Sequence, residues 1–211
     1  MKMTTGSPVS PTPVELTKAR TTPDIVEVRP RTFLAISGEE GPETEEFAAS
    51  IGALYGIAYS LKFSRKKTIG DDFKVGALVG IWWAEGHDLS TGQVPPRDTW
   101  RWTVQIDVPE DVAADEFAAA VGTAVRKKGG KLEGTPYAGK VTLTQEAARR
   151  YGRILHVGPF ADEPQSFERI DDLLKREGLA REMWHVEVYL SDPQRTAPEK
   201  LKTVLLSPIA D

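Results

Sequence analysis

The sequence predicts an α+β domain built from two consecutive βαββ units, related by pseudo-two-fold symmetry around a central ligand cleft. Three observations predict this class. Short segments alternate apolar and polar residues, as half-buried strands do, and longer segments repeat apolar residues at helical spacing. The order strand, helix, strand, strand then occurs twice along the chain. A chain of 211 residues is long enough for one such domain with a substantial core.

The first unit begins with a strand and a long helix. Residues 24–28 alternate polar and apolar side chains and residues 32–36 continue extended, so we predict one strand here, with Pro30 as the place for a bend. Within residues 43–63, apolar side chains fall at positions i, i+4, i+7, i+11 and i+14, which predicts a helix with one buried stripe. The stripe consists of Phe47, Ile51, Leu54, Ala58 and Leu61.

The remaining elements follow from alternation, helical spacing and the positions of Gly and Pro. Two strands close the first unit, at residues 73–83 and 99–108, and a Gly- and Pro-containing loop joins them. The later elements are expected, in order, as a helix at 112–128, strands at 141–143 and 151–157, a helix at 164–177, a strand at 183–190 and an edge strand at 202–206.

Composition excludes several classes of partner. The formal net charge of −4 gives no electrostatic reason to expect nucleic acid. No segment approaches the roughly 18 apolar residues of a membrane span. The chain has no cysteine, and its three histidines stand at no metal-ligand spacing, so we expect no metal and no cofactor. No obligate protein partner is evident either.

The N-terminal residues differ in composition from the rest. Residues 1–22 are rich in Thr, Ser and Pro and lack the apolar block of a signal peptide. We therefore predict a disordered tail at 1–22, a single domain at 23–211, and a cytoplasmic location.

Aromatic side chains are concentrated in the predicted strands. Alternation places Trp82 and Trp83 on opposite faces of their strand, whereas Trp100 and Trp102 share one face. Each tryptophan taken alone is explained by a place in the core. Five of them, with Tyr55 and Tyr59 one turn apart on a helix, exceed what a core of this size needs. Aromatic walls with a few polar groups are typical of pockets for small molecules, which favours a flat aromatic ligand.

The strand at 183–190 carries a carboxylate near its centre. By the period of two, His185, Glu187 and Tyr189 share one face. If Glu187 is buried, its charge needs hydrogen bonds or a cation. The alternative is the solvated face of an edge strand. We also expect His156 and His185 to form a structural hydrogen-bonded pair rather than to act as catalysts.

Several motifs resemble the GyrI-like small-molecule-binding proteins, and the likeness runs from about residue 24 to residue 209. The C-terminal motif is LSDP at 190–193 followed by RTAPEKLKT at 195–203. The other matching segments are HVGPF at 156–160, DEP at 162–164, WRWT at 100–103, GALY at 52–55, AY at 58–59 and WW at 82–83.

The resemblance implies a tandem βαββ fold of the SHS2 type, with a pocket for planar, aromatic and often cationic compounds around one central glutamate. Glu187 matches that glutamate. Val79 stands where the family usually has a second glutamate. This stand-alone branch resembles proteins that hydrolyse the cyclopropane ring of DNA-alkylating antibiotics of the yatakemycin and CC-1065 type, and so give detoxification or self-resistance.

On this hypothesis, Glu187 is the general base that activates water, and Tyr137 or Tyr189 donates a hydrogen bond to the substrate. The expected substrate-binding residues are Trp83, Trp102, Tyr55, Tyr59, Phe160 and His185. Two alternatives remain open. The protein could bind and sequester planar aromatic compounds without turnover, or it could regulate a protein partner, as gyrase-inhibitory relatives are thought to do.

Overall fold

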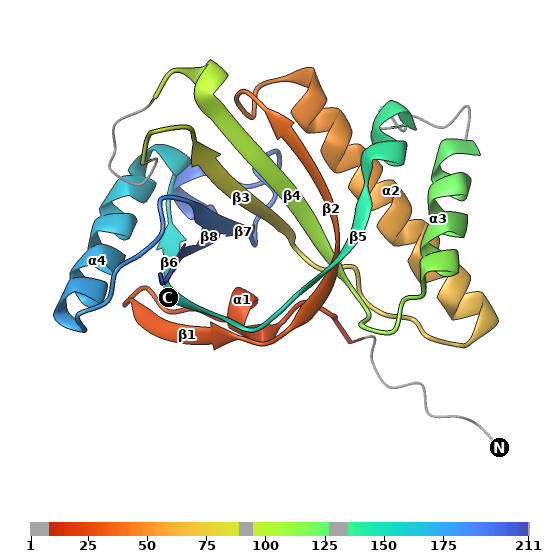
Figure 1. Ribbon diagram of the computed structural model, residues 1–211, viewed down its shortest axis with the longest axis horizontal. Coiled ribbons are helices and arrows are strands. Elements are labelled where there is room, and N and C mark those ends of the chain that lie inside the picture. Colours follow the sequence, from red (N-terminus) through yellow and green to blue (C-terminus); the bar gives the residue numbers. More distant parts are fainter. Residues whose placement is uncertain (1–8, 89–94, 127–134, 211) are drawn as a thin grey trace.

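The computed structural model describes residues 9–88, 95–126 and 135–210. Eight strands form one antiparallel sheet in the order β1-β6-β8-β7-β3-β4-β2-β5. Figure 1 shows that the sheet curls strongly, with α2 and α3 over one half and α4 over the other. Within these described ranges, no helix is long and apolar enough to cross a membrane.

Two βαββ units make up most of this sheet, which confirms the predicted class. The first unit contains β2 (Arg31–Glu39), α2 (Glu45–Thr68), β3 (Leu78–Ala84) and β4 (Trp100–Val108). The second contains β6 (Arg149–Val157), α4 (Glu163–Arg176), β7 (His185–Tyr189) and β8 (Lys202–Pro208). In each unit the third strand lies between the first and the second. The units join where β3 pairs with β7, so these two strands lie at the pseudo-two-fold axis.

The other elements extend or cover the units. Strand β1 (Asp24–Val28) pairs with β6 at one edge, and β5 (Thr142–Glu146) pairs with β2 at the other. The additional helices are α1 (Val14–Thr17), α3 (Ala114–Arg126) and the short 3₁₀ helices η2 (Arg97–Thr99), η3 (Thr135–Lys140), η4 (Phe160–Asp162) and η5 (Pro198–Lys200). The expected helix at 112–128 thus corresponds to α3, and residues 127 and 128 lie outside the described residues.

Helix α2 has clear sequence reasons for its ends. The Thr44 hydroxyl caps the N-terminus by accepting a hydrogen bond from the Phe47 backbone N–H at 3.3 Å. Basic residues fill the last turn, where they complement the helix dipole. One of them, Arg65, is buried and its guanidinium binds three carboxylates at 2.8–2.9 Å, those of Asp71, Asp111 and Glu116. This network holds the C-terminus of α2 to the start of α3.

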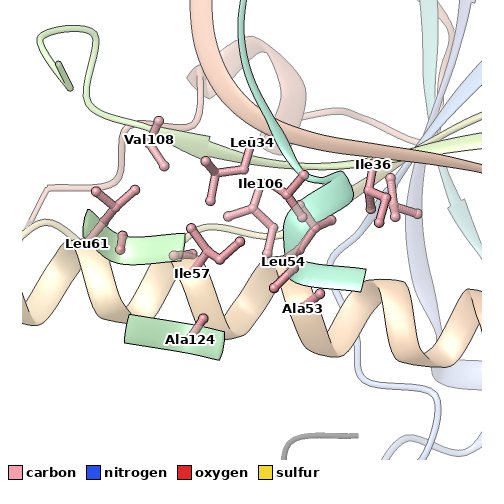
Figure 2. Close-up of a cluster of buried hydrophobic side chains, with 14 of the residues drawn as sticks. Leu34, Ile36, Ala53, Leu54, Ile57, Leu61, Ile106, Val108 and Ala124 are labelled. Atoms are coloured by element: carbon pink, nitrogen blue, oxygen red, sulfur yellow. The ribbon is translucent and has the colours of Figure 1, made fainter. Parts of the chain in front are cut away.

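The core lies on both faces of the sheet. Figure 2 shows apolar side chains of α2 facing those of β2 and β4, including Leu54, Ile57, Leu34 and Ile106. Helix α4 packs in the same way on β6 and β8. On the opposite face, Leu16 of α1 packs with residues of the central strands.

Three expectations about the strands are wrong in detail. Residues 24–36 form two strands in different halves of the sheet: β1 pairs with β6, and β2 pairs with β4. The chain changes partner at Pro30, which has no backbone N–H to continue a ladder of hydrogen bonds. The last strand, β8, is internal, between β6 and β7, and its residues are buried on both faces. Strand β3 begins at Leu78, not at residue 73.

Part of the N-terminal segment, within residues 9–22, makes packing contacts with the rest of the domain. Leu16 is 3% exposed and joins the apolar cluster under the central strands. The Arg153 guanidinium donates to the Glu15 carbonyl, and the Leu155 N–H donates to the Arg20 carbonyl at 2.7 Å. Short polar stretches of this kind carry no periodic pattern, which is why the sequence did not reveal the packing.

Candidate functional site

Glu187 lies where the two units meet. In the register of the sheet, Glu187 of β7 lies between two partners: Gly80 of β3 is opposite it on one side, and Leu205 of β8 is opposite it on the other. Directly opposed residues share a face, so Glu187 is on the face that α2 and α4 cover. Glycine at position 80 allows the Trp82 and Tyr189 side chains to approach the backbone closely. A Cβ there would lie 2.8 Å from the Trp82 indole nitrogen and 3.0 Å from the Tyr189 hydroxyl.

The Glu187 carboxylate is buried among hydrogen-bond donors. Its side chain is 12% exposed, and His185 Nε2 lies 3.0 Å from Glu187 Oε1. We assign the ring proton to Nε2, which donates to the carboxylate. Nδ1 of the same ring is buried and has no partner among the described residues, so it suits the nitrogen that carries no hydrogen. The Trp82 indole N–H donates to the Tyr189 oxygen at 2.9 Å. Burial, and then the adjacent Glu187 charge, raises the pKa of Tyr189 well above its usual range, so Tyr189 keeps a proton to offer Glu187.

A second carboxyl group, Glu163, accompanies Glu187. Glu163 is the first residue of α4 and is 6% exposed. Its Oε1 is buried without a hydrogen-bond partner among the described residues. Burial, and then the charge of Glu187, raises the pKa of Glu163 well above its usual range, while the nearby Thr203 hydroxyl opposes the rise.

The helix N-terminus does not reverse this shift. The α4 dipole favours a charge on Glu163 by roughly 0.3–1 kcal/mol. Burial of a carboxylate without a cation costs several kcal/mol, and no cation pairs with Glu163 among the described residues. The larger effect prevails, so the pKa of Glu163 stays raised above its usual range.

The sequence patterns discussed above do not single out Glu163, although the sequence carries a signal for it. The buried apolar residues of α4 are Phe167, Ile170 and Leu174. They follow Glu163 by 4, 7 and 11 positions, so Glu163 belongs to the same helical stripe. An acid on the buried stripe of a helix must face the sheet. Acids in the first turn of a helix are common for reasons of capping and dipole alone, which makes this signal easy to discount.

The structure brings three of the predicted site residues together with Glu187. These are His185 and Tyr189, on the same strand, and Phe160, whose ring packs edge-on against that of Tyr189 with 6.1 Å between centroids. Phe160 is 41% exposed, so it marks the outer side of the cluster. The indole next to Tyr189 is Trp82, opposite His185, and not Trp83.

The remaining predicted residues have other neighbours in the structure. Trp102 is fully buried, packs edge-on against Phe47 and donates its N–H to the Glu39 carbonyl at 3.1 Å, so it belongs to the core. Tyr55 and Tyr59 stack on each other along α2, 6.3 Å apart. Tyr137 is in η3, which packs against α2 and α3, away from α4 in Figure 1. It does not join the Glu187 cluster.

Trp83 faces the opposite side of the sheet, where it is paired with Arg101. There it lines a hollow of about 510 Å³, together with Ser37, Gly38, Glu39, Glu40, Thr44, Glu46, Arg101 and Lys140. Glu187 is not among the lining residues. Two of the lining acids form ion pairs with neighbours, Glu39 with Arg101 and Glu46 with Lys140. Because the hollow holds no buried titratable group, we place the candidate site at Glu187 instead.

The two histidines do not form the expected pair. His156 Nδ1 bonds to the Ser166 hydroxyl at 3.0 Å, and its Nε2 bonds to the Pro159 carbonyl at 3.1 Å. It therefore ties β6 to the start of α4 as a structural residue. In the described ranges there is no group of three or more His, Cys, Asp or Glu side chains arranged to hold a metal ion.

The fold is that of an α+β domain with a tandem βαββ sheet. Residues 102–210 match the GyrI-like small molecule binding domain, and the chain belongs to this family. It is similar in structure to an uncharacterized conserved protein from Listeria innocua, with 31% identity and a TM-score of 0.79 over 91% of this chain and 94% of that one.

Two further Listeria innocua structures, both described as hydrolases, are similar. One has 29% identity and a TM-score of 0.77 over 91% of this chain and 93% of its own. The other has 28% identity and a TM-score of 0.76 over 92% and 94%. No curated protein matches the chain.

Proposed function

We propose that this protein is a hydrolase that opens the cyclopropane ring of DNA-alkylating cyclopropanoid antibiotics, and so provides detoxification or self-resistance. The observation that carries the proposal is the Glu187 carboxylate, buried at the junction of the two units and held by His185. The similarity to two proteins described as hydrolases supports the reaction class. The resemblance to the stand-alone GyrI-like branch supports the substrate.

The chemistry needs a base close to a flat, strained electrophile. The cyclopropane of these compounds is conjugated to a dienone, so addition of water restores an aromatic phenol. Glu187 would take a proton from the attacking water, while His185 and Tyr189 hold its carboxylate in one orientation. Phe160 and Tyr189 offer ring surface to a planar substrate. A positioned base contributes on the order of 10²–10⁴-fold to the rate.

A second function is favoured by the charge at the site. One ionised carboxylate among aromatic rings also suits a planar cation. The protein would then bind and sequester planar aromatic compounds without changing them.

Turnover separates the two functions. The purified protein is incubated with an excess of a cyclopropane-bearing alkylator, and the products are measured by mass spectrometry. A hydrolase converts many equivalents to the compound with one added water. Consumption of a single equivalent without a hydrated product would show sequestration.

A further inference from the structure

We propose that Glu163 is the acid partner of Glu187, so that Glu163 carries a proton, Glu187 carries a negative charge, and the proton of Glu163 is delivered to the substrate. The catalytic part of this inference rests on the hydrolase function proposed above. The pairing of the two carboxyl groups does not, and it can be tested without any substrate.

The surroundings decide which group holds the charge. Glu187 is 3.0 Å from His185 Nε2 and interacts with the Tyr189 hydroxyl. Glu163 has only the nearby Thr203 hydroxyl, and its Oε1 lacks a partner among the described residues. Two adjacent carboxyl groups in a buried site do not both ionise readily. The group with more donors keeps the charge, and the other keeps the proton.

The titratable groups near Glu163 lie on the strands that α4 covers. On β7 they are His185, Glu187 and Tyr189. On β6 the group is His156, which lies opposite Thr203 and is already bonded to Ser166 and Pro159. None of these groups forms an ion pair with Glu163, so nothing in its described surroundings favours the loss of its proton.

Glu163 is also placed to meet a ligand of Glu187. Phe160, three residues earlier, packs against Tyr189, so the start of α4 covers the outer part of β7. Tyr189 is a weaker choice of donor, since its oxygen accepts from Trp82 and the phenol lies beside the Glu187 carboxylate. Tyr137 is not in the cluster. The unpartnered carboxyl of Glu163 is therefore the group best suited to donate.

The reaction step then balances. Glu187 takes a proton from water as the water oxygen bonds to the cyclopropane carbon. The ring C–C bond breaks, and its electron pair completes the aromatic ring and leaves negative charge on the former dienone oxygen. Glu163 gives its proton to that oxygen. The proton on Glu187 then passes to Glu163, which restores the pair after the net addition of one water.

The pairing is tested on the free protein by NMR of ¹³C-labelled glutamate side chains. In the wild-type protein, the Glu163 carboxyl signal, assigned by its loss in Glu163→Gln, is expected at the position of a protonated acid at neutral pH. In Glu187→Gln, its titration midpoint should fall by about one pH unit or more, because the neighbouring charge is gone. An ionised Glu163 at neutral pH, or a midpoint unchanged by Glu187→Gln, would overturn the pairing.

The proton delivery is tested by the pH dependence of turnover. Glu163→Gln keeps the size and neutrality of the protonated acid but cannot give up a proton. We expect its rate to fall about tenfold or more, with loss of the alkaline limb of the pH profile and little change in substrate affinity. The matched control is Asp162→Asn, which removes an exposed neighbouring acid and should leave the rate unchanged.

The outcomes distinguish the two proposals. A Glu163→Gln variant as fast as wild type would refute proton delivery, because amide and acid then serve equally. If no variant and no wild-type protein turns over the alkylator, the hydrolase function fails, and the NMR result still decides whether the two carboxyl groups form a pair.

Discussion

The buried acid Glu163 should make the stability of this protein depend on pH. In the folded protein its pKa is raised above the ordinary value of 4.5, first by burial and then by Glu187. Above that ordinary value, the unfolded chain releases the proton of Glu163 while the folded protein retains it. The folded state then binds more protons, so the free energy of unfolding falls as the pH rises, until the raised pKa is passed. Below the ordinary value the penalty is absent.

The magnitude follows from this linkage. Within the window between the two pKa values, the wild-type protein loses about 1.4 kcal/mol of stability per pH unit from this group. Glutamine at position 163 does not ionise and avoids the loss. As the pH rises from the ordinary value toward the raised one, the stability of Glu163→Gln relative to the wild type should therefore grow by roughly 1 kcal/mol per pH unit.

Urea unfolding at pH 5, 6 and 7 measures this difference directly. The wild type, Glu163→Gln and the exposed-acid control Asp162→Asn are compared at each pH. The gap between Glu163→Gln and wild type should widen with pH, while Asp162→Asn should follow the wild type. A gap that stays constant across this range would refute the claim that Glu163 is neutral in the folded protein.

Three further predictions concern the core and the strand faces. Leu16→Ala should lower the free energy of unfolding by about 2–4 kcal/mol if the N-terminal segment packs as described, whereas an unpacked tail would show no loss in urea unfolding. Arg65→Met should lower the free energy of unfolding by about 1–3 kcal/mol, which is less than the loss of a fully buried ion pair, because the partner carboxylates are partly exposed. A loss that does not depend on salt concentration would contradict the ion-pair explanation. Trp82→Phe removes the hydrogen bond to Tyr189 and should slow turnover about fivefold. Trp83→Ala, on the opposite face of the sheet, should leave the rate within about twofold of the wild type. A larger loss of rate in Trp83→Ala than in Trp82→Phe would place the site at the Trp83 hollow instead.

Local patterns in the sequence predicted the elements and one side of the site. The period of two on β7 correctly grouped His185, Glu187 and Tyr189, because side-chain direction in a strand is a local property. The same rule showed that Trp82 and Trp83 diverge. It did not show which of them shares the face of Glu187, because that depends on the register between β3 and β7.

The rest depended on strand order and on long-range packing. The extended segment at the C-terminus was expected at an edge, but β8 is internal since β6 and β7 pair on either side of it. Glu163 approaches Glu187 only when α4 folds onto the second half of the sheet. The buried stripe of α4 contained enough information to predict that Glu163 faces inward, but not which residue it would meet.

The most direct test of the central claim is turnover by Glu187→Gln. This variant keeps the shape of the side chain but removes its charge and its basicity. With a neutral cyclopropane substrate, the rate should fall about tenfold or more while substrate affinity changes by less than about threefold. Binding of a cationic dye to the same variant shows whether the carboxylate also acts as an electrostatic anchor. Full turnover by Glu187→Gln would contradict the hydrolase mechanism.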